Sequence, residues 1–412
     1  MLKQYARSSE CSGNSFTIKG LCISLVNSVK TASTLVFWAD EMRTSGKTLM
    51  TLLNEVDDPR KPSNGTLHDF QEILVIAICA VLSDADNVDD FAEWARLKEG
   101  WLRRFLVLKH GIPSQDTFLR VFGALNPKKF EAVFRRWVGG MVPALSRTLA
   151  VDGKTLRGSG KGADSPVHMV SAFATDLGLV LGQEKVVGKS NEITAIPELL
   201  QALYLKGHRV TIDAMGCQKA IATQIVAQKG DYLLAVKGNQ PTLLAAIQKA
   251  FDPLSGEQPW HEHSERSHGR RVTQFAWVAP AEGVVNTTDW SACQTIGCIV
   301  SQRVVGDKVA EAEWRYYISS REMTATDLAQ SARAHWAVEN RLHWVLDVTF
   351  GEDASQIRND HAPQNFSLLK KIVLNMLRLD TTGKAKTSLR QKRKLAAWDD
   401  DIRAAILGIQ PL

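Results

Sequence analysis

The chain has 412 residues, 44% of them hydrophobic and 23% charged, with a formal net charge of +6. This is the composition of an ordinary globular protein, long enough for two or three domains, and the positive excess modestly favours a polyanionic partner such as nucleic acid. The six cysteines are scattered without a CxxC pair, which excludes a disulfide framework and fits reduced thiols in a cytoplasm. Asn27 and Lys30 interrupt the apolar stretch 21–38, so we expect no membrane anchor.

The first third of the chain divides into two parts. Residues 1–48 differ in texture from everything that follows, and we treat them as an extension whose native status the sequence leaves open. Residues 49–145 carry the apolar periodicity of helices and predict a small helical domain, with helices capped at Thr66, Ser114 and Asn126. The helix after Ser114 has a polar face suited to a DNA major groove, and the alternative is a domain for dimerisation or support.

Strands and helices alternate in the next region. The pattern predicts three strands, a helix, a strand, a second helix and a further strand, which is the order of an RNase H-like core. The strands are expected at 149–151, 168–174, 179–187, 209–212 and 232–236, and the helices after 190–192 and at 219–227. The chain is therefore predicted to be an α/β protein with an RNase H-like catalytic core, preceded by the small helical domain.

The remaining residues add strands and then helices. Strand patterns at 272–278, 296–305 and 314–319 predict a strand-rich insertion at about 241–320, inside a catalytic domain that spans 146–380. A long helix is expected over 324–346, and the chain returns to helix after Asp360. Residues 381–412 form a basic tail, which is a second candidate for contact with DNA.

Two aspartates follow predicted strands: Asp152 comes after 149–151, and Asp213 comes after 209–212. Ligands bind at strand ends in α/β sheets, and a carboxylate at the end of a buried strand is costly unless its charge is paired or used. Two such carboxylates indicate a shared divalent cation such as Mg²⁺. The alternative for Asp152 is a turn residue, because Gly153 follows it.

Two further acidic residues are each compatible with a purely structural role when taken alone. Glu339 lies on the predicted helix 324–346 among aromatic and basic residues, where an amphipathic helix would also place it. Glu192 is interpreted first as a favourable charge at a helix N-terminus, and only second as a neighbour of the active site.

Seven ordered segments carry a family resemblance. They are AVDGKTLRGS at 150–159, KSNEITAIPELL at 189–200, IDAMGCQK at 212–219, DYLLAVKGNQ at 231–240, SHGR at 267–270, RYYISS at 315–320 and HWAVENRLHWVLDVTF at 335–350. In these segments the chain resembles the ISAs-type, or H-repeat-associated, transposases of bacterial insertion sequences. The resemblance runs from about Leu49 to near the C-terminus, and residues 1–48 have no counterpart in it.

The resemblance implies a DDE triad of Asp152, Asp213 and Glu339 that holds two ions of Mg²⁺ or Mn²⁺. It implies metal-dependent hydrolysis of a phosphodiester at the element ends, followed by strand transfer of the freed 3′ hydroxyl into target DNA. The expected partners are double-stranded DNA, as terminal inverted repeats and as target, and a second subunit in a homodimer on DNA. Six basic residues fall at motif positions expected to contact DNA: Lys154, Arg157, Lys189, Lys237, Arg270 and Arg341. The alternative for each of them taken alone is a solvated surface charge, and as a group they would neutralise phosphates.

Two further functions stay open at this point. A nuclease on the same fold would cleave DNA without joining it, and an inactive remnant would bind DNA without cleaving it. The resemblance also points to His335 as a further DNA contact, and to a bacterial cytoplasm with the nucleoid as the place of action.

Overall fold

The computed structural model describes residues 49–63, 65–141, 148–162, 165–187, 192–252, 260–267, 270–305, 308–381 and 386–409. The predicted extension at 1–48 and the predicted DNA contact Lys189 lie outside these residues. Within them, one mixed ten-stranded sheet has the order β3-β2-β1-β4-β5-β10-β8-β7-β6, and β9 pairs with β8. No helix of the described part is long and apolar enough to cross a membrane.

The first five strands form one half of this sheet. β1 pairs in parallel with β4 and antiparallel with β2, β2 pairs antiparallel with β3, and β4 pairs in parallel with β5. This order, with parallel strands at the centre and an antiparallel pair at the edge, is the RNase H-like arrangement, so the predicted fold class is confirmed. The bounds are β1 Thr148–Leu156, β2 Val167–Ala174, β3 Leu179–Lys185, β4 Arg209–Ile212 and β5 Asp231–Val236.

The predicted insertion extends the same sheet. β10 pairs antiparallel with both β5 and β8, so the insertion strands continue directly from the core strands. The predicted strands 272–278, 296–305 and 314–319 fall within β7, β8 and β10. The bounds are α10 Pro241–Phe251, β6 His261–Ser267, β7 Arg270–Pro280, β8 Thr295–Val305, β9 Lys308–Val309 and β10 Glu313–Ser319.

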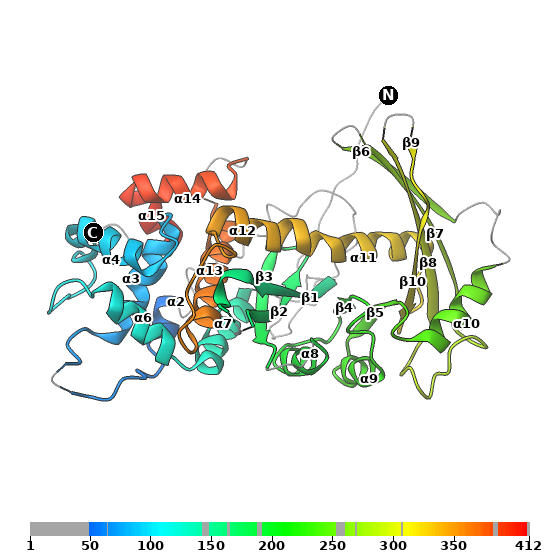
Figure 1. The fold of residues 1–412 in the computed structure, drawn as a ribbon, viewed down its shortest axis with the longest axis horizontal. Coiled ribbons are helices and arrows are strands. Elements are labelled where there is room, and N and C mark those ends of the chain that lie inside the picture. The colour runs from blue at the N-terminus through cyan, green and yellow to red at the C-terminus, as the bar shows by residue number, and fades with distance from the viewer. Residues whose placement is uncertain are drawn as a thin grey trace, which may run out of the picture.

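Helices cover both faces of the core sheet (Figure 1). α8 (Glu192–Gln201) and α9 (Lys219–Ala227) lie on one face, while α11 (Ala325–Val338) and α12 (Trp344–Phe350) lie on the other. α11 begins with a capping box in which Thr324 and Asp327 satisfy each other's backbone N–H groups. It contacts β1 and β4 of the core and β6, β7 and β8 of the insertion, so one helix spans both parts of the sheet.

The N-terminal helices share a hydrophobic core with the C-terminal ones. α13 is buried along almost its whole length and contacts α3, α6, α7 and β3, while α14 and α15 pack against α3. The bounds are α2 Leu49–Leu53, α3 Phe70–Leu82, α4 Val88–Leu97, α5 Glu99–Leu102, α6 Gln115–Ala124, α7 Pro127–Met141, α13 Ala362–Leu379, α14 Leu389–Trp398 and α15 Asp400–Leu407.

Two of the three predicted helix starts are confirmed. Ser114 caps α6 by accepting the N–H of Thr117, and Asn126 accepts two N–H groups at the start of α7. The third prediction is wrong, because Asp69 and not Thr66 caps α3: the Asp69 carboxylate accepts the N–H of Glu72. Asp69 stands directly before the first helical residue, where a short side-chain oxygen reaches the free backbone N–H groups.

Candidate active site

Asp152 and Asp213 lie side by side on neighbouring parallel strands. Val151 of β1 pairs with Ile212 of β4, and each aspartate is the next residue along its own strand. The sequence predicted that the strand ends at Asp152, but β1 continues to Leu156 because it stays paired with β2. Asp152 therefore marks the point where the parallel pairing with β4 stops.

Backbone N–H groups hold the carboxylate of Asp213. One of its oxygens accepts hydrogen bonds from the N–H of Met215 at 3.0 Å and of Gly216 at 3.4 Å. Asp213 thus stands at the start of the turn that leads into α9, and the two bonds fix the orientation of its carboxylate.

Glu339 faces Asp152 from the helix layer. α11 ends at Val338, and residues Glu339–His343 form a π-helical turn before α12 begins at Trp344. The N–H of Trp344 bonds to the carbonyl of Glu339, five residues back, which marks the extra residue in this turn. The predicted helix 324–346 is thus confirmed as helical, but it continues to Phe350 and contains a π-turn at the third acidic residue, a feature often found at functional sites.

A histidine that the sequence analysis did not single out completes a cluster. His343 Nδ1 lies 3.4 Å from a carboxylate oxygen of Glu339 and 3.6 Å from one of Asp152. The donor atoms of these three residues all lie within 4.8 Å of one another. Asp213 stands beside this cluster rather than inside it. The sequence signal for His343 was its spacing, because a residue four positions after Glu339 lies on the same side of a helix.

The electrostatics of the cluster favour a bound cation. Burial, followed by the negative charge of Glu339, raises the pKa of Asp152 to about 8, and Glu192 and Asp213 add to this effect. Burial lowers the pKa of His343 against the attraction of Glu339, so the imidazole is neutral at pH 7. Carboxylate oxygens and a neutral imidazole nitrogen are donors that divalent metals accept, and a cation between them removes the repulsion among the acids. The residues therefore fit a divalent metal.

Glu192 fits both interpretations, because it is the acidic residue in the first turn of α8 and its charge also acts on Asp152. Its carboxylate lies 2.7 Å from Nε2 of His168, whose Nδ1 lies 2.8 Å from the hydroxyl of Thr155. A Cβ on Gly153 would lie 2.0 Å from the Glu192 carboxylate, so only glycine leaves room for this chain of contacts beside Asp152. His168 was not singled out from the sequence because nothing in its local pattern marks it.

Lys154 is enclosed by acids. Its ammonium lies 2.7 Å from Asp347, 2.6 Å from Asp353 and 3.5 Å from Glu352, and its side chain is 11% exposed. Burial by itself would lower the pKa of Lys154, but these carboxylates outweigh it and raise the pKa. The charge is compensated inside the protein, in a contact that ties β1 to α12 and to the segment after it.

The other predicted DNA contacts lie in different surroundings. Arg157 is 81% exposed and pairs with Asp353 at 3.3 Å, while Lys237 and Arg270 are exposed at the end of β5 and the start of β7. Arg341 packs against the turn between β2 and β3, where it donates to the carbonyl of Thr175. His335 is half-buried, with Nδ1 3.1 Å from the hydroxyl of Thr211, and burial lowers its pKa.

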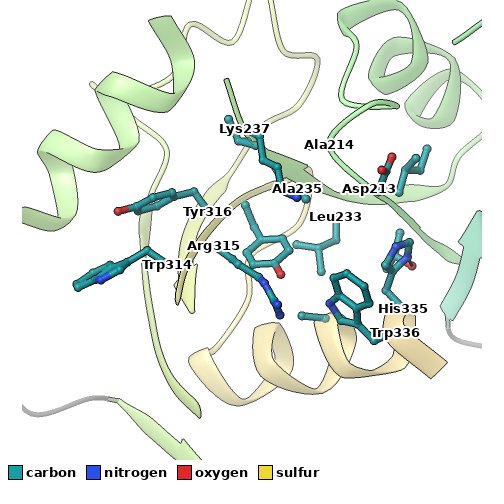
Figure 2. A pocket seen from close by; sticks show the side chains of 15 residues that line it. Asp213, Ala214, Leu233, Ala235, Lys237, Trp314, Arg315, Tyr316, His335 and Trp336 are labelled. Carbon is teal, nitrogen blue, oxygen red and sulfur yellow. Dashed lines mark hydrogen bonds between the residues drawn. The ribbon is translucent and has the colours of Figure 1, made fainter. Parts of the chain in front are cut away.

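A hollow with aromatic and basic walls opens beside Asp213 (Figure 2). Residues from β4, β5, β10 and α11 line it. Trp336 is 46% exposed, and the Arg315 guanidinium lies 5.0 Å from the centre of its ring. Lys237 and Arg315 line the same hollow as Asp213, and the Arg315 guanidinium is paired with Glu313 at 2.8 Å. Arg315 and Trp336 sit in segments that carry the family resemblance, but the sequence alone did not bring them together.

Comparison with known proteins decides the family. Residues 143–376 match the family described as Transposase DDE domain, and residues 50–138 match its DDE_Tnp_1-associated domain. The chain belongs to the DDE transposase family. It is 40% identical to "H repeat-associated putative transposase YhhI" of Escherichia coli K12 over 83% of this chain and 93% of that one. It is also 40% identical to "Putative transposase YncI" of Escherichia coli O157:H7, over 85% and 92% respectively.

A solved structure, a piggyBac transposase synaptic complex with hairpin DNA, aligns with a TM-score of 0.39 at 10% identity, over 90% of this chain and 80% of that one. The fold of this transposase is assigned from its strand order and family. Membership of the DDE family implies dependence on a divalent metal, and the cluster of Asp152, Glu339 and His343 is the place in the described residues where such donors converge.

Proposed function

We propose that this transposase hydrolyses a phosphodiester at the ends of its insertion sequence and then joins the freed 3′ hydroxyl to target DNA. Asp152, Asp213 and Glu339 would hold two divalent ions, Mg²⁺ or Mn²⁺, in this reaction. The observation that carries the proposal is the convergence of two aspartates on adjacent parallel strands with a glutamate that faces them from a helix crossing the sheet.

The residues of the chain have distinct parts in this chemistry. When bound, the divalent ions supply Lewis acidity and lower the pKa of water, so that an oxygen nucleophile forms near neutral pH. Asp213 offers a carboxylate whose orientation is fixed by two backbone N–H groups. Asp152 must lose its proton before it can bind a cation; burial and then repulsion from Glu339 raise its pKa, and a bound cation would offset both effects.

The basic residues support a DNA path past the acids. Lys237 and Arg315 border the hollow beside Asp213, Arg157 is exposed near the other side of β1, and Arg270 starts the strand β7 of the insertion. Lys237, Arg157 and Arg270 are exposed, and exposed cations neutralise phosphates of double-stranded DNA without reading its sequence, whereas Arg315 is 23% exposed and paired with Glu313. We place the terminal inverted repeats and the target DNA here, with two subunits of the transposase each holding one end, in a bacterial cytoplasm with the nucleoid.

The test is a cleavage and strand-transfer assay on linear DNA that bears the ends of the flanking element, with Mg²⁺ or Mn²⁺ present. We expect joined product from the wild-type protein and at least about a thousandfold loss of both steps in Asp213→Asn, because the loss of one charged ligand weakens the metal site. Asp252→Asn, which changes an exposed aspartate at the end of α10, is the matched control and should keep both activities.

Each other result counts against part of the proposal. Cleavage without joined product would overturn strand transfer and leave a nuclease. DNA binding with no cleavage in either metal would overturn catalysis and identify an inactive remnant. Near-normal, metal-dependent cleavage by Asp213→Asn would overturn the role of this carboxylate.

A further inference from the structure

The π-turn at Glu339–His343 brings an imidazole into the acidic cluster. His343 is placed with Nδ1 toward Glu339 and Asp152, and its side chain is 8% exposed. The residue after it, Trp344, is 58% exposed, so the turn buries the histidine while its neighbour points to solvent. The extra residue of the π-turn therefore aims His343 at β1, on the same side of the helix as Glu339.

The contacts of His343 are poor ones for a hydrogen-bonded core histidine. The 3.4 Å and 3.6 Å separations from the two carboxylates are longer than ordinary N–H···O bonds. The other ring nitrogen, Nε2, is buried without a hydrogen-bond partner among the described residues. An imidazole nitrogen that faces two carboxylate oxygens is stable only when a proton or a metal cation lies between them.

We propose that His343 is a metal ligand, so that Asp152, Glu339 and His343 bind one divalent cation through two carboxylates and an imidazole nitrogen. This inference rests on the proposed metal-dependent function, and it adds a nitrogen donor to the three acids. Mg²⁺ binds oxygen donors almost alone, whereas imidazole strengthens the binding of first-row transition metals. The site is therefore built to bind Mn²⁺ or Co²⁺ more tightly than Mg²⁺.

The direct test is pulsed electron paramagnetic resonance of Mn²⁺ bound to the full-length protein, prepared with ordinary or with ¹⁵N-labelled histidine. We expect nitrogen coupling from one histidine, with the frequency change that ¹⁵N produces. This measurement is made on the wild-type protein, so it does not depend on whether any variant folds.

Variants then assign the nitrogen. His343→Gln should lose the coupling and bind Mn²⁺ about tenfold or more weakly by titration calorimetry, with a change of less than about threefold for Mg²⁺. His335→Gln is the matched control, because His335 feels the charges of Asp213 and Glu339 but turns Nδ1 to the hydroxyl of Thr211. It should keep the coupling and the affinity for Mn²⁺.

The failures of the two proposals are distinguishable. Mn²⁺ bound to the wild-type protein without nitrogen coupling would overturn the role of His343 and leave the metal site intact. Coupling that survives in His343→Gln and disappears in His335→Gln would overturn it as well. A wild-type protein that binds no Mn²⁺ would overturn the metal site itself, and with it the proposed chemistry.

Discussion

At the scale of single residues, burial separates two basic side chains that the sequence presents as equivalent. Lys154 and Arg157 stand three positions apart in one motif, and both contact Asp353. Lys154 is also held by Asp347 and Glu352, and little of it reaches solvent, whereas Arg157 is largely exposed. A cation enclosed by acids stabilises the fold, and an exposed one remains available to phosphate.

This contrast gives a prediction with a built-in control. Lys154→Met leaves three carboxylates without their cation, so we expect the free energy of unfolding to fall by about 3 kcal/mol, with no change in the salt dependence of DNA binding. Arg157→Met should change the free energy of unfolding by less than about 0.5 kcal/mol. It should also make the negative slope of the logarithm of the DNA-binding constant against the logarithm of salt concentration shallower by about 1. Denaturant titration and binding measured at several salt concentrations check both. The opposite assignment would be shown by a reduced slope and unchanged stability in Lys154→Met.

The sequence indicates the three proposed catalytic acids and names Glu192 as a possible neighbour, but it does not indicate the contacts of His168 and His343. Asp152 and Asp213 follow apolar strands, and strand order brings such residues to one edge of a sheet. Glu339 required the family resemblance, because the solvated face of any amphipathic helix would also carry an acid at that position. His168 could not be predicted, because its contact with Glu192 depends on the register of β2 against β1, which no local pattern encodes.

At the scale of elements, the sequence predicted where helices and strands lie better than how they end or bend. The core strands and the strands β7, β8 and β10 of the insertion follow from their apolar, β-branched runs, but β6 has the polar sequence HEHSERS and was not predicted. The π-turn in the helix after Ala325 did not follow from periodicity, because five residues of changed winding leave the apolar pattern readable on both sides. The cap of α3 was misplaced because Thr66 and Asp69 are both good capping residues, and only the geometry of the turn selects Asp69.

The packing of α7 against β3 contains a buried acid whose protonation is coupled to folding. Glu131 accepts the N–H of Gln183 at 2.9 Å, and its second oxygen is buried without a hydrogen-bond partner among the described residues. Burial raises the pKa of Glu131 to about 7, against the opposing charge of Arg135 at 3.7 Å. In the unfolded chain a glutamate titrates near about 4.3, so the folded state holds this proton over a range in which the unfolded state has lost it.

The sign of the pH dependence follows from this difference. The proton on Glu131 contributes on the order of 3 kcal/mol to the free energy of unfolding. This contribution is fully present below about pH 4.3 and is lost as the pH rises through about 7. Glu131→Gln keeps a neutral group at every pH, so denaturant unfolding from pH 5 to pH 8 should show a smaller loss of stability than in the wild type. Arg135→Gln removes the opposing cation and should enlarge the loss. Identical pH profiles for wild type and Glu131→Gln would contradict this account.

At the scale of the whole molecule, the C-terminal helices hold the N-terminal helices and the catalytic core together. Asn375 of α13 donates to and accepts from the backbone of Val180, which satisfies the edge of β3 as a further strand would. Asn365 of the same helix donates to the carbonyls of Phe122 and Leu125 at the end of α6. Hydrogen bonds from α13 to β3 of the core and to α6 of the N-terminal helices fix how these elements pack, in addition to their apolar contacts.

Arg393 makes the same kind of link from the basic tail. Its side chain is fully buried, and it donates to the carbonyls of Val81 and Ala85 near the end of α3 and pairs with Asp86 at 2.9 Å. It also donates to the carbonyl of Thr349 in α12, and its guanidinium lies 4.6 Å from the centre of the Phe350 ring. A guanidinium can satisfy several carbonyls at once, and the negative end of the α3 dipole adds to the attraction.

The last prediction follows from this position. Arg393→Met should lower the free energy of unfolding by about 3 to 5 kcal/mol, because several buried carbonyls and a carboxylate lose their donor together. It should also weaken DNA cleavage, because α12 follows directly on the π-turn that carries Glu339. Arg390→Met changes an exposed arginine of the same helix and should leave unfolding within about 0.5 kcal/mol of the wild type. If the Arg390 variant lost more stability than the Arg393 variant, the tail would be anchored through its surface and not through this buried cation.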